Sequence, residues 1–109
     1  MPMNDAPAPT REWFRADAYR RDCSAVVTAV VGQGVVLDQT VFYPVGGGQA
    51  GDAGVLVLAD GRELPIVDTR KGKDADGRPT GGIVHVVAAD AQTLLTGLQV
   101  GDAVSARID

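Results

Sequence analysis

The sequence predicts an all-β domain in which about six short antiparallel strands close into a small barrel. Val-rich runs recur along the chain, and turns containing Gly, Pro or Asp separate them. No stretch keeps a helical period long enough to supply the crossover helices that a parallel sheet needs. The 109 residues suffice for one such domain. We therefore expect a single barrel and not an α/β fold.

The N-terminal part of the chain has a different composition. Residues 1–10 contain three prolines and mostly small side chains, so we expect a flexible leader, followed by one β-barrel domain over residues 11–109. Arg11 to Cys23 carries four arginines and three aromatic residues. This composition predicts a short helical segment that packs aromatic side chains against the barrel. An arm that contacts RNA is the alternative.

The expected strands follow one another at short intervals. Gly32-Gln33-Gly34 and Asp60-Gly61 mark two turns between them. Pro44 ends a third run, because proline cannot donate to a strand ladder. The runs are Ser24–Val31, Val35–Leu37, Gln39–Tyr43, Val55–Leu58, Leu64–Asp68, Ile83–Val87 and Val100–Ile108.

Two segments lack a strand pattern. Thr69–Gly82 is polar and Gly-rich and contains both lysines, so it predicts a long exposed loop. Asp90–Leu98 predicts a helical turn or two, capped by Asp90 and closed by Gly97.

Composition excludes several functions. One cysteine, Cys23, and one histidine, His85, cannot build a zinc site from Cys and His alone. Cys23 begins a predicted strand and is expected to be packed. The net charge of −4 counts against a stand-alone nucleic-acid binder, because Lys and Arg carry phosphate affinity. Neither a signal peptide nor a long apolar segment is present, so a cytoplasmic protein without membrane contact is expected.

The stretch from Thr40 to Gly54 is unlike the rest. Five glycines fall between Gly46 and Gly54, where they permit tight turns and close approach of a ligand. The stretch lacks the Lys-Ser/Thr pair of a P-loop, and a strand follows it where a P-loop has a helix. The residues alone leave open a barrel corner and a ligand-facing loop.

The string DQTVFYPVGGGQ, from Asp38 to Gln49, is followed by Asp52-Ala53-Gly54 and closely resembles the alanyl-tRNA synthetase editing family. That family includes free-standing, AlaX-like alanyl-tRNA editing proteins. The segments Trp13–Tyr19, Ile83–Val87 and Gly101–Asp109 also resemble parts of it. The resemblance extends over nearly the whole chain from Arg11.

The resemblance implies a β-barrel of the translation-factor type placed before an editing domain. That editing domain hydrolyses mischarged aminoacyl-tRNA(Ala), with zinc held by an HxxxH motif, a Cys and a further His. A chain with one histidine has no HxxxH motif. We therefore expect zinc in an editing domain outside these 109 residues, no cofactor or metal site in the chain itself, and no catalysis by it alone.

By the same resemblance, a Gly-rich loop faces the editing pocket near the aminoacyl end of tRNA. This loop consists of Gly46, Gly47, Gly48 and Gln49. Tyr43, Asp52 and His85 are candidate supporting residues. From the residues themselves, Asp38 and Asp52 are expected to cap turns, and His85 to be a hydrogen-bonded core or interface residue.

The lysine-containing basic cluster supplies candidate phosphate contacts. Asp74 and Asp76 lie within it, so a solvated loop is the other interpretation. The cluster consists of Arg70, Lys71, Lys73 and Arg78.

Three functions follow as hypotheses. The first is an N-terminal accessory domain of a protein that acts on mischarged alanine tRNA, with a partner protein domain that brings the zinc. The second is a free-standing barrel that binds a synthetase, an editing protein or tRNA in trans. The third is an independent hydrolase centred on Gln49 and His85, for which the sequence shows no third residue to orient the pair.

Overall fold

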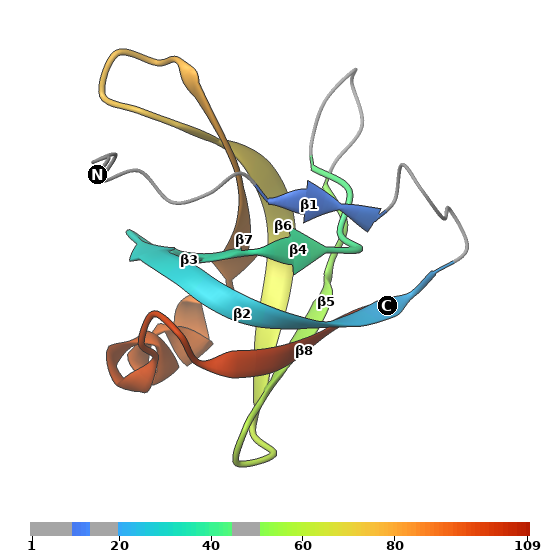
Figure 1. Cartoon of the computed structure of the whole chain (residues 1–109). Coiled ribbons are helices and arrows are strands. Elements are labelled where there is room, and N and C mark those ends of the chain that lie inside the picture. The colour runs from blue at the N-terminus through green and yellow to red at the C-terminus, as the bar shows by residue number, and fades with distance from the viewer. Residues whose placement is uncertain (1–9, 14–19, 45–50) are drawn as a thin grey trace.

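Six strands of the computed structural model, which describes residues 10–13, 20–44 and 51–109, close into a ring (Figure 1). Every neighbouring pair is antiparallel, in the order β2-β3-β7-β6-β5-β8. The predicted all-β fold with a six-stranded antiparallel barrel is therefore confirmed. The strands are β2 (Asp22–Val31), β3 (Gly34–Leu37), β5 (Gly54–Leu58), β6 (Glu63–Lys73), β7 (Pro79–Val87) and β8 (Ala103–Ile108).

Alternation along each strand builds the core. In β2, Cys23, Ala25 and Val27 are buried, and Ser24 and Val26 between them are exposed. This period of two is that of a strand with one face turned to the interior. All six strands contribute to the core, through Cys23, Val27, Leu37, Leu56, Leu64, Val87 and Ala106 among others.

A short parallel pair, β1 (Arg11–Glu12) and β4 (Gln39–Thr40), lies beside the barrel. Arg11 and Glu12, expected at the start of a helical segment, are thus in a strand. In the rest of that segment, Trp13 is helical and packs partly buried against the core, residues 14–19 lie outside the described residues, and β2 begins at Asp22. Thr10 is buried, and its Oγ1 donates to Leu37 O at 2.7 Å and accepts from Ile83 N at 3.0 Å. The ordered domain therefore includes the residue expected to end the leader.

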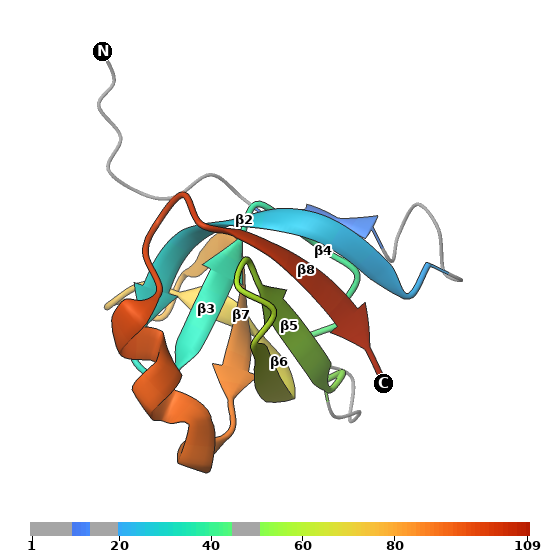
Figure 2. The same ribbon diagram turned by 90° about the horizontal axis from the view of Figure 1, so that it is seen from below.

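The segment between β7 and β8 is a 3₁₀ helix, η1 (Ala89–Gly97), on one side of the barrel (Figure 2). A short helix ending at Gly97 was expected, but its predicted cap was wrong. The N-cap is Ala88, and no side chain caps the helix, because it begins one residue before Asp90. Leu95 from η1 enters the core. No helix within the described ranges is long and apolar enough to cross a membrane.

The predicted loop over Thr69–Gly82 was wrong. β6 continues to Lys73 and β7 begins at Pro79, so these residues form a long hairpin that projects at the top of Figure 1. Ile66 pairs with Val87 and Asp68 with Val86, which leaves Val67 as an extra residue. Such a β-bulge shifts which side chains face inward. Leu64 and Ile66 are buried before it, and Thr69 after it.

Gly54 allows β5 to approach β8 closely, and a substitution there tests this contact. A Cβ at Gly54 would lie 3.0 Å from Ile108 Cα and 2.9 Å from Phe42 Cζ, and would press on Arg107 O. Because β8 backbone atoms cannot retreat without loss of strand pairing, Gly54→Ala should lower the free energy of unfolding by about 2 kcal/mol. Urea denaturation followed by circular dichroism measures this.

Gly97→Ala is the matched control, because no atom lies within 4 Å of the Cβ it adds. It should leave the free energy of unfolding unchanged or raise it by up to about 1 kcal/mol. Equal losses in the two variants would contradict this account of Gly54.

Candidate functional site

The Gly-rich segment begins and ends at one point of the barrel. Tyr43 N donates to Asp52 Oδ2 at 2.9 Å, and Asp52 N donates to Tyr43 O at 2.9 Å. The expectation that Asp52 caps a turn is confirmed, because its carboxylate accepts a backbone N–H across the ends of the segment. Tyr43 and Asp52 together form what we call the loop base.

The loop itself falls outside the described residues. Its glycines and its glutamine therefore stay predicted site residues, without a structural account. They are Gly46, Gly47, Gly48 and Gln49.

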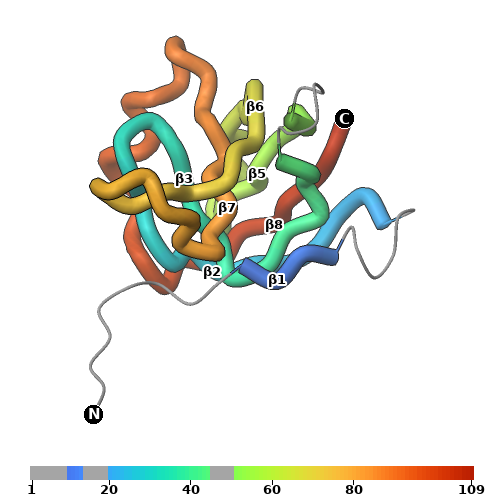
Figure 3. Tube along the Cα trace, turned by 90° about the horizontal axis from the view of Figure 1, so that it is seen from above, coloured from blue at the N-terminus to red at the C-terminus, as the bar shows by residue number. Residues whose placement is uncertain are grey.

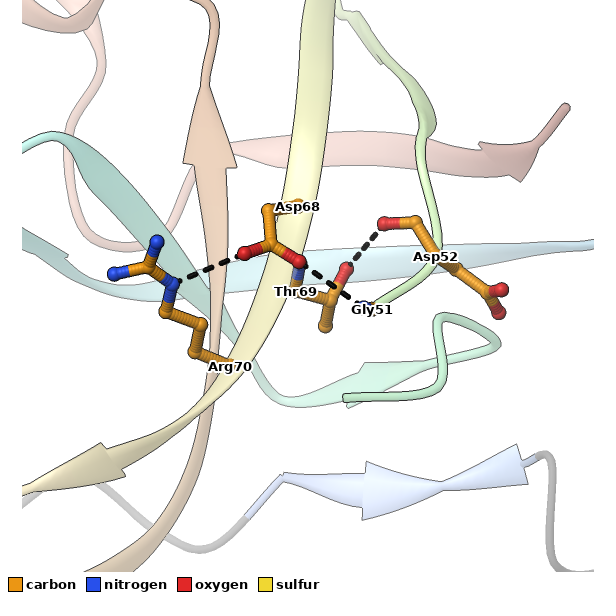
Figure 4. A network of polar contacts seen from close by, with 5 residues as sticks. All are labelled: Gly51, Asp52, Asp68, Thr69 and Arg70. Atoms are coloured by element: carbon orange, nitrogen blue, oxygen red, sulfur yellow. Dashed lines mark hydrogen bonds and ion pairs between the residues drawn. The ribbon is translucent and has the colours of Figure 1, made fainter. Parts of the chain in front are cut away.

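Strand β6 holds the loop base from one side (Figure 4). Asp68 Oδ1 accepts from Gly51 N at 3.1 Å and from Thr69 N at 2.9 Å, and Asp68 Oδ2 accepts from Arg70 Nε at 3.1 Å. Thr69 Oγ1 donates to Asp52 O at 2.8 Å. Burial alone would raise the pKa of Asp68, but these hydrogen bonds and the charge of Arg70 outweigh it and lower that pKa below its ordinary value.

Hydrogen bonds in the barrel interior hold the backbone that leads into the loop base. His85 Nε2 lies 2.7 Å from Thr40 Oγ1, and His85 Nδ1 lies 2.9 Å from Val35 O. A carbonyl only accepts, so Nδ1 carries the proton and Nε2 accepts from the Thr40 hydroxyl. Thr40 Oγ1 in turn accepts from Phe42 N at 3.0 Å. This chain of contacts fixes the backbone immediately before Tyr43.

His85 is a structural residue in this arrangement. Its side chain is fully buried, with an edge-to-face contact to Phe42 at 5.1 Å between ring centroids. Burial lowers the pKa of His85 to about 4, so the ring is neutral at physiological pH. The predicted hydrogen-bonded core role is confirmed. The hypothesis of a hydrolase that uses His85 is wrong, because both ring nitrogens are occupied and substrate cannot reach them.

The basic cluster is divided by the hairpin. Arg70, Lys71 and Lys73 lie on β6. Arg78 follows the hairpin turn, where its N donates to Asp74 Oδ1 at 2.9 Å. The structure thus aligns three of the four cations on one strand and leaves Arg78 at the tip, beside carboxylates.

The remaining chemically distinctive residues have structural surroundings. Cys23 is buried, and burial raises the pKa of its thiol although Arg20 opposes the shift. Asp38 Oδ1 accepts from Val26 N at 2.8 Å, so this carboxylate ties β2 to the segment before β4. No three His, Cys, Asp or Glu residues among those described lie together as metal ligands.

Sequence reasoning missed Asp68 and Thr69. Both were placed at the border between a strand and a loop, and their partners Gly51 and Asp52 lie 17 residues earlier. The sequence offered one signal, an Asp-Thr pair directly after the point where the apolar–polar alternation of the strand breaks. The partners of this pair follow only from the pairing of β5 with β6.

The pKa of His85 predicts a pH dependence of stability. In the unfolded chain the His85 ring is protonated below about pH 6.5, whereas in the folded chain it is protonated only below about pH 4. The free energy of unfolding is therefore highest above pH 6.5 and falls as the pH drops toward 4. We expect a loss of about 1 kcal/mol between pH 7.5 and 5.5, measured by urea denaturation.

His85→Asn is the control, and it should lose that part of the pH dependence. Because this variant risks misfolding, an NMR titration of the single histidine gives an independent reading. Its ring protons should keep constant shifts from pH 7.5 to 5.5, and a midpoint near 6.5 would refute the buried neutral ring.

The chain is similar in sequence to known proteins. Residues 15–109 match the model of the family described as tRNA synthetases class II (A). The chain is 38% identical over 107 residues to an alanine–tRNA ligase of Metallosphaera sedula, a match that covers 98% of this chain and 10% of the ligase. It is 37% identical over 102 residues to the alanyl-tRNA editing protein AlaX-M of Methanosarcina mazei, covering 92% of this chain and 38% of that protein.

A further alanine–tRNA ligase, from Pyrobaculum neutrophilum, is 51% identical over 63 residues, which are 57% of this chain and 7% of the ligase. The chain thus spans a tenth or less of these ligases and 38% of the editing protein. Because the family model covers most of its length, the chain belongs to the class II (A) tRNA synthetase family, in the part of it that contains alanyl-tRNA synthetases and their editing relatives.

Proposed function

We propose that the chain is an accessory domain of an alanyl-tRNA synthetase-like editing protein. In this role it holds the Gly-rich loop close to the aminoacyl end of mischarged tRNA(Ala), where a second domain hydrolyses the ester. The observation that carries the proposal is the loop base, because Tyr43 and Asp52 bind each other twice. These two hydrogen bonds hold the described residues on either side of the loop next to each other.

The loop base is supported independently from two directions. Asp68 and Thr69 bind residues 51 and 52 from β6, and the His85–Thr40 pair orders the backbone that enters the loop. A simple barrel corner needs neither set of contacts. The composition of the loop suits this role, because glycine has no side chain and the Gln49 amide has donors and an acceptor.

The hydrolytic step is assigned to a partner domain. The described residues hold neither a metal-ligand cluster nor an exposed histidine. A zinc ion in the partner domain would position the ester, as the family resemblance implies. The part of this chain is to orient that domain and the tRNA end relative to each other.

The alternative function, a barrel that binds a protein in trans, also has one observation in its favour. Strands β2, β5 and β8 border an open groove of about 450 Å³ on the barrel surface. Small and apolar side chains line much of it, including Ser24, Val26 and Ser105. Such a surface and a net charge of −4 suit a protein better than bare RNA.

A chimera tests the accessory role. The region of Methanosarcina mazei AlaX-M that matches this chain is replaced by the chain, and deacylation of Ser-tRNA(Ala) is measured. The chimera should be active, and the 109-residue chain alone should be inactive. Asp52→Ala and Gln49→Ala in the chimera should each lower kcat by about tenfold or more, because a displaced loop misplaces the ester.

Asp60→Ala is the matched control. Asp60 also accepts a backbone N–H in a turn, from Arg62 at 3.0 Å, but it lies in the β5–β6 turn, outside the loop base. It should leave kcat unchanged. Equal losses for Asp52→Ala and Asp60→Ala, or deacylation by the chain alone, would overturn the proposed role.

A further inference from the structure

Strands β3, β7 and β6 pair side by side in the barrel (Figure 3). A groove of about 340 Å³ lies over them on the outer face. Arg70, Lys71 and Lys73 line it from β6, Gly34 from β3 and Val84 from β7. We call this feature the β6 groove. It is distinct from the loop base.

The β6 groove is locally cationic in an acidic protein. The chain has 14 acidic and 10 basic residues, yet the described residues that line the groove include three cations and no carboxylate. Lys71 and Lys73 have no ion pair within the described ranges. Arg70 is paired with Asp68, and its side chain stays 63% exposed. The net charge of −4 therefore conceals a basic strip.

Backbone irregularities shape this strip. Pairing shifts between Lys71 and Lys73, because Lys71 lies opposite Ile83 and Lys73 opposite Pro79. Arg70 and Lys71 are neighbours and are both exposed, against the usual alternation of a strand. Lys71 and Lys73 lie about 6–7 Å apart along the strand. That spacing is comparable with the distance between neighbouring phosphates of one RNA strand.

Two glycines let the strands beneath the groove pack closely against each other. A Cβ at Gly34 would press on Val84 Cγ1 and lie 3.0 Å from His85 O, and one at Gly72 would lie 2.7 Å from Thr80 Oγ1. The half-buried side chain of Val84 adds an apolar part to the lining of the groove.

Asp68 joins the β6 groove to the loop base. One of its oxygens accepts from Gly51 N and the other from Arg70 Nε, so the carboxylate lies between the two sites (Figure 4). The β6 groove and the loop base therefore share one carboxylate.

We propose that the β6 groove binds the phosphodiester backbone of RNA and directs the strand toward the loop base. The spacing of about 6–7 Å between Lys71 and Lys73 matches a polymer with one charge per nucleotide better than an acidic peptide, whose charges vary in spacing. The tRNA identity of the ligand rests on the proposed function. RNA binding itself is measured on this chain without any deacylation.

The test uses the full 109-residue chain and a minihelix RNA of the tRNA(Ala) acceptor stem with its unpaired 3′ end. Affinity is measured by fluorescence anisotropy over a series of salt concentrations. The triple variant Arg70→Gln, Lys71→Gln, Lys73→Gln should bind at least about tenfold more weakly at 0.1 M salt. The slope of log K against log salt should fall by about 2–3, because each lost phosphate contact removes nearly one unit.

The charge-matched control replaces Arg21, Arg62 and Arg107 by Gln, which changes the net charge equally but leaves the groove intact. It should bind within about twofold of the unmodified chain, as should Lys71→Arg with Lys73→Arg, which keep the charges. Circular dichroism confirms that each variant is folded.

Three outcomes would overturn the proposal: no binding by the unmodified chain, equal losses in the two triple variants, or competition by polyglutamate as effective as that by RNA. The last would indicate an acidic protein as the partner. Each of these outcomes leaves the chimera experiment informative, because deacylation by the chimera and RNA binding by the isolated chain are separate measurements.

Discussion

One extra residue in β6 sets the geometry of both surfaces described above. Val67 bulges from the pairing with β7, and beyond it the inward and outward faces of the strand exchange. Thr69 consequently points inward and reaches Asp52 O, and Asp68 reaches Gly51 N. Without the bulge, Thr69 would face solvent and the carboxylate of Asp68 would enter the apolar core, at a large desolvation cost.

The second constraint is a polar group placed inside that core. His85 is buried among apolar side chains, and such a group is tolerated only when its hydrogen bonds are complete. Thr40 and Val35 complete them, and no buried side-chain polar atom of the described residues is left without a partner. Hydrophobic residues in place of His85 and Thr40 would fill the same volume. They would not form the hydrogen bonds that direct the backbone as it leaves β4. The histidine thus specifies a backbone path, whereas the surrounding valines and leucines supply the stability.

The sequence predicted the barrel because, in most of the chain, local patterns of strands and turns agree with the observed strand pairing. Val-rich alternation and the Asp60-Gly61 turn each specify structure within a few residues. The Thr69–Gly82 hairpin was missed because the bulge at Val67 breaks the alternation and polar residues follow it. At the site, Asp52 and His85 were identified from local context. The contacts of Asp68 depend on strand pairing across 17 residues, which no local pattern encodes.

Asp68 would couple the binding of ligands at the two surfaces. Its two oxygens bind Gly51 N and Arg70 Nε, so its charge is divided between the loop base and the β6 groove. A ligand anion that draws Arg70 away from Asp68 would strengthen the hydrogen bond from Gly51 N to Asp68. A change at Gly51 would in turn alter the ion pair between Asp68 and Arg70. By linkage, the two effects carry the same coupling free energy. A single carboxylate can in this way transmit occupancy between two sites with no movement of the barrel.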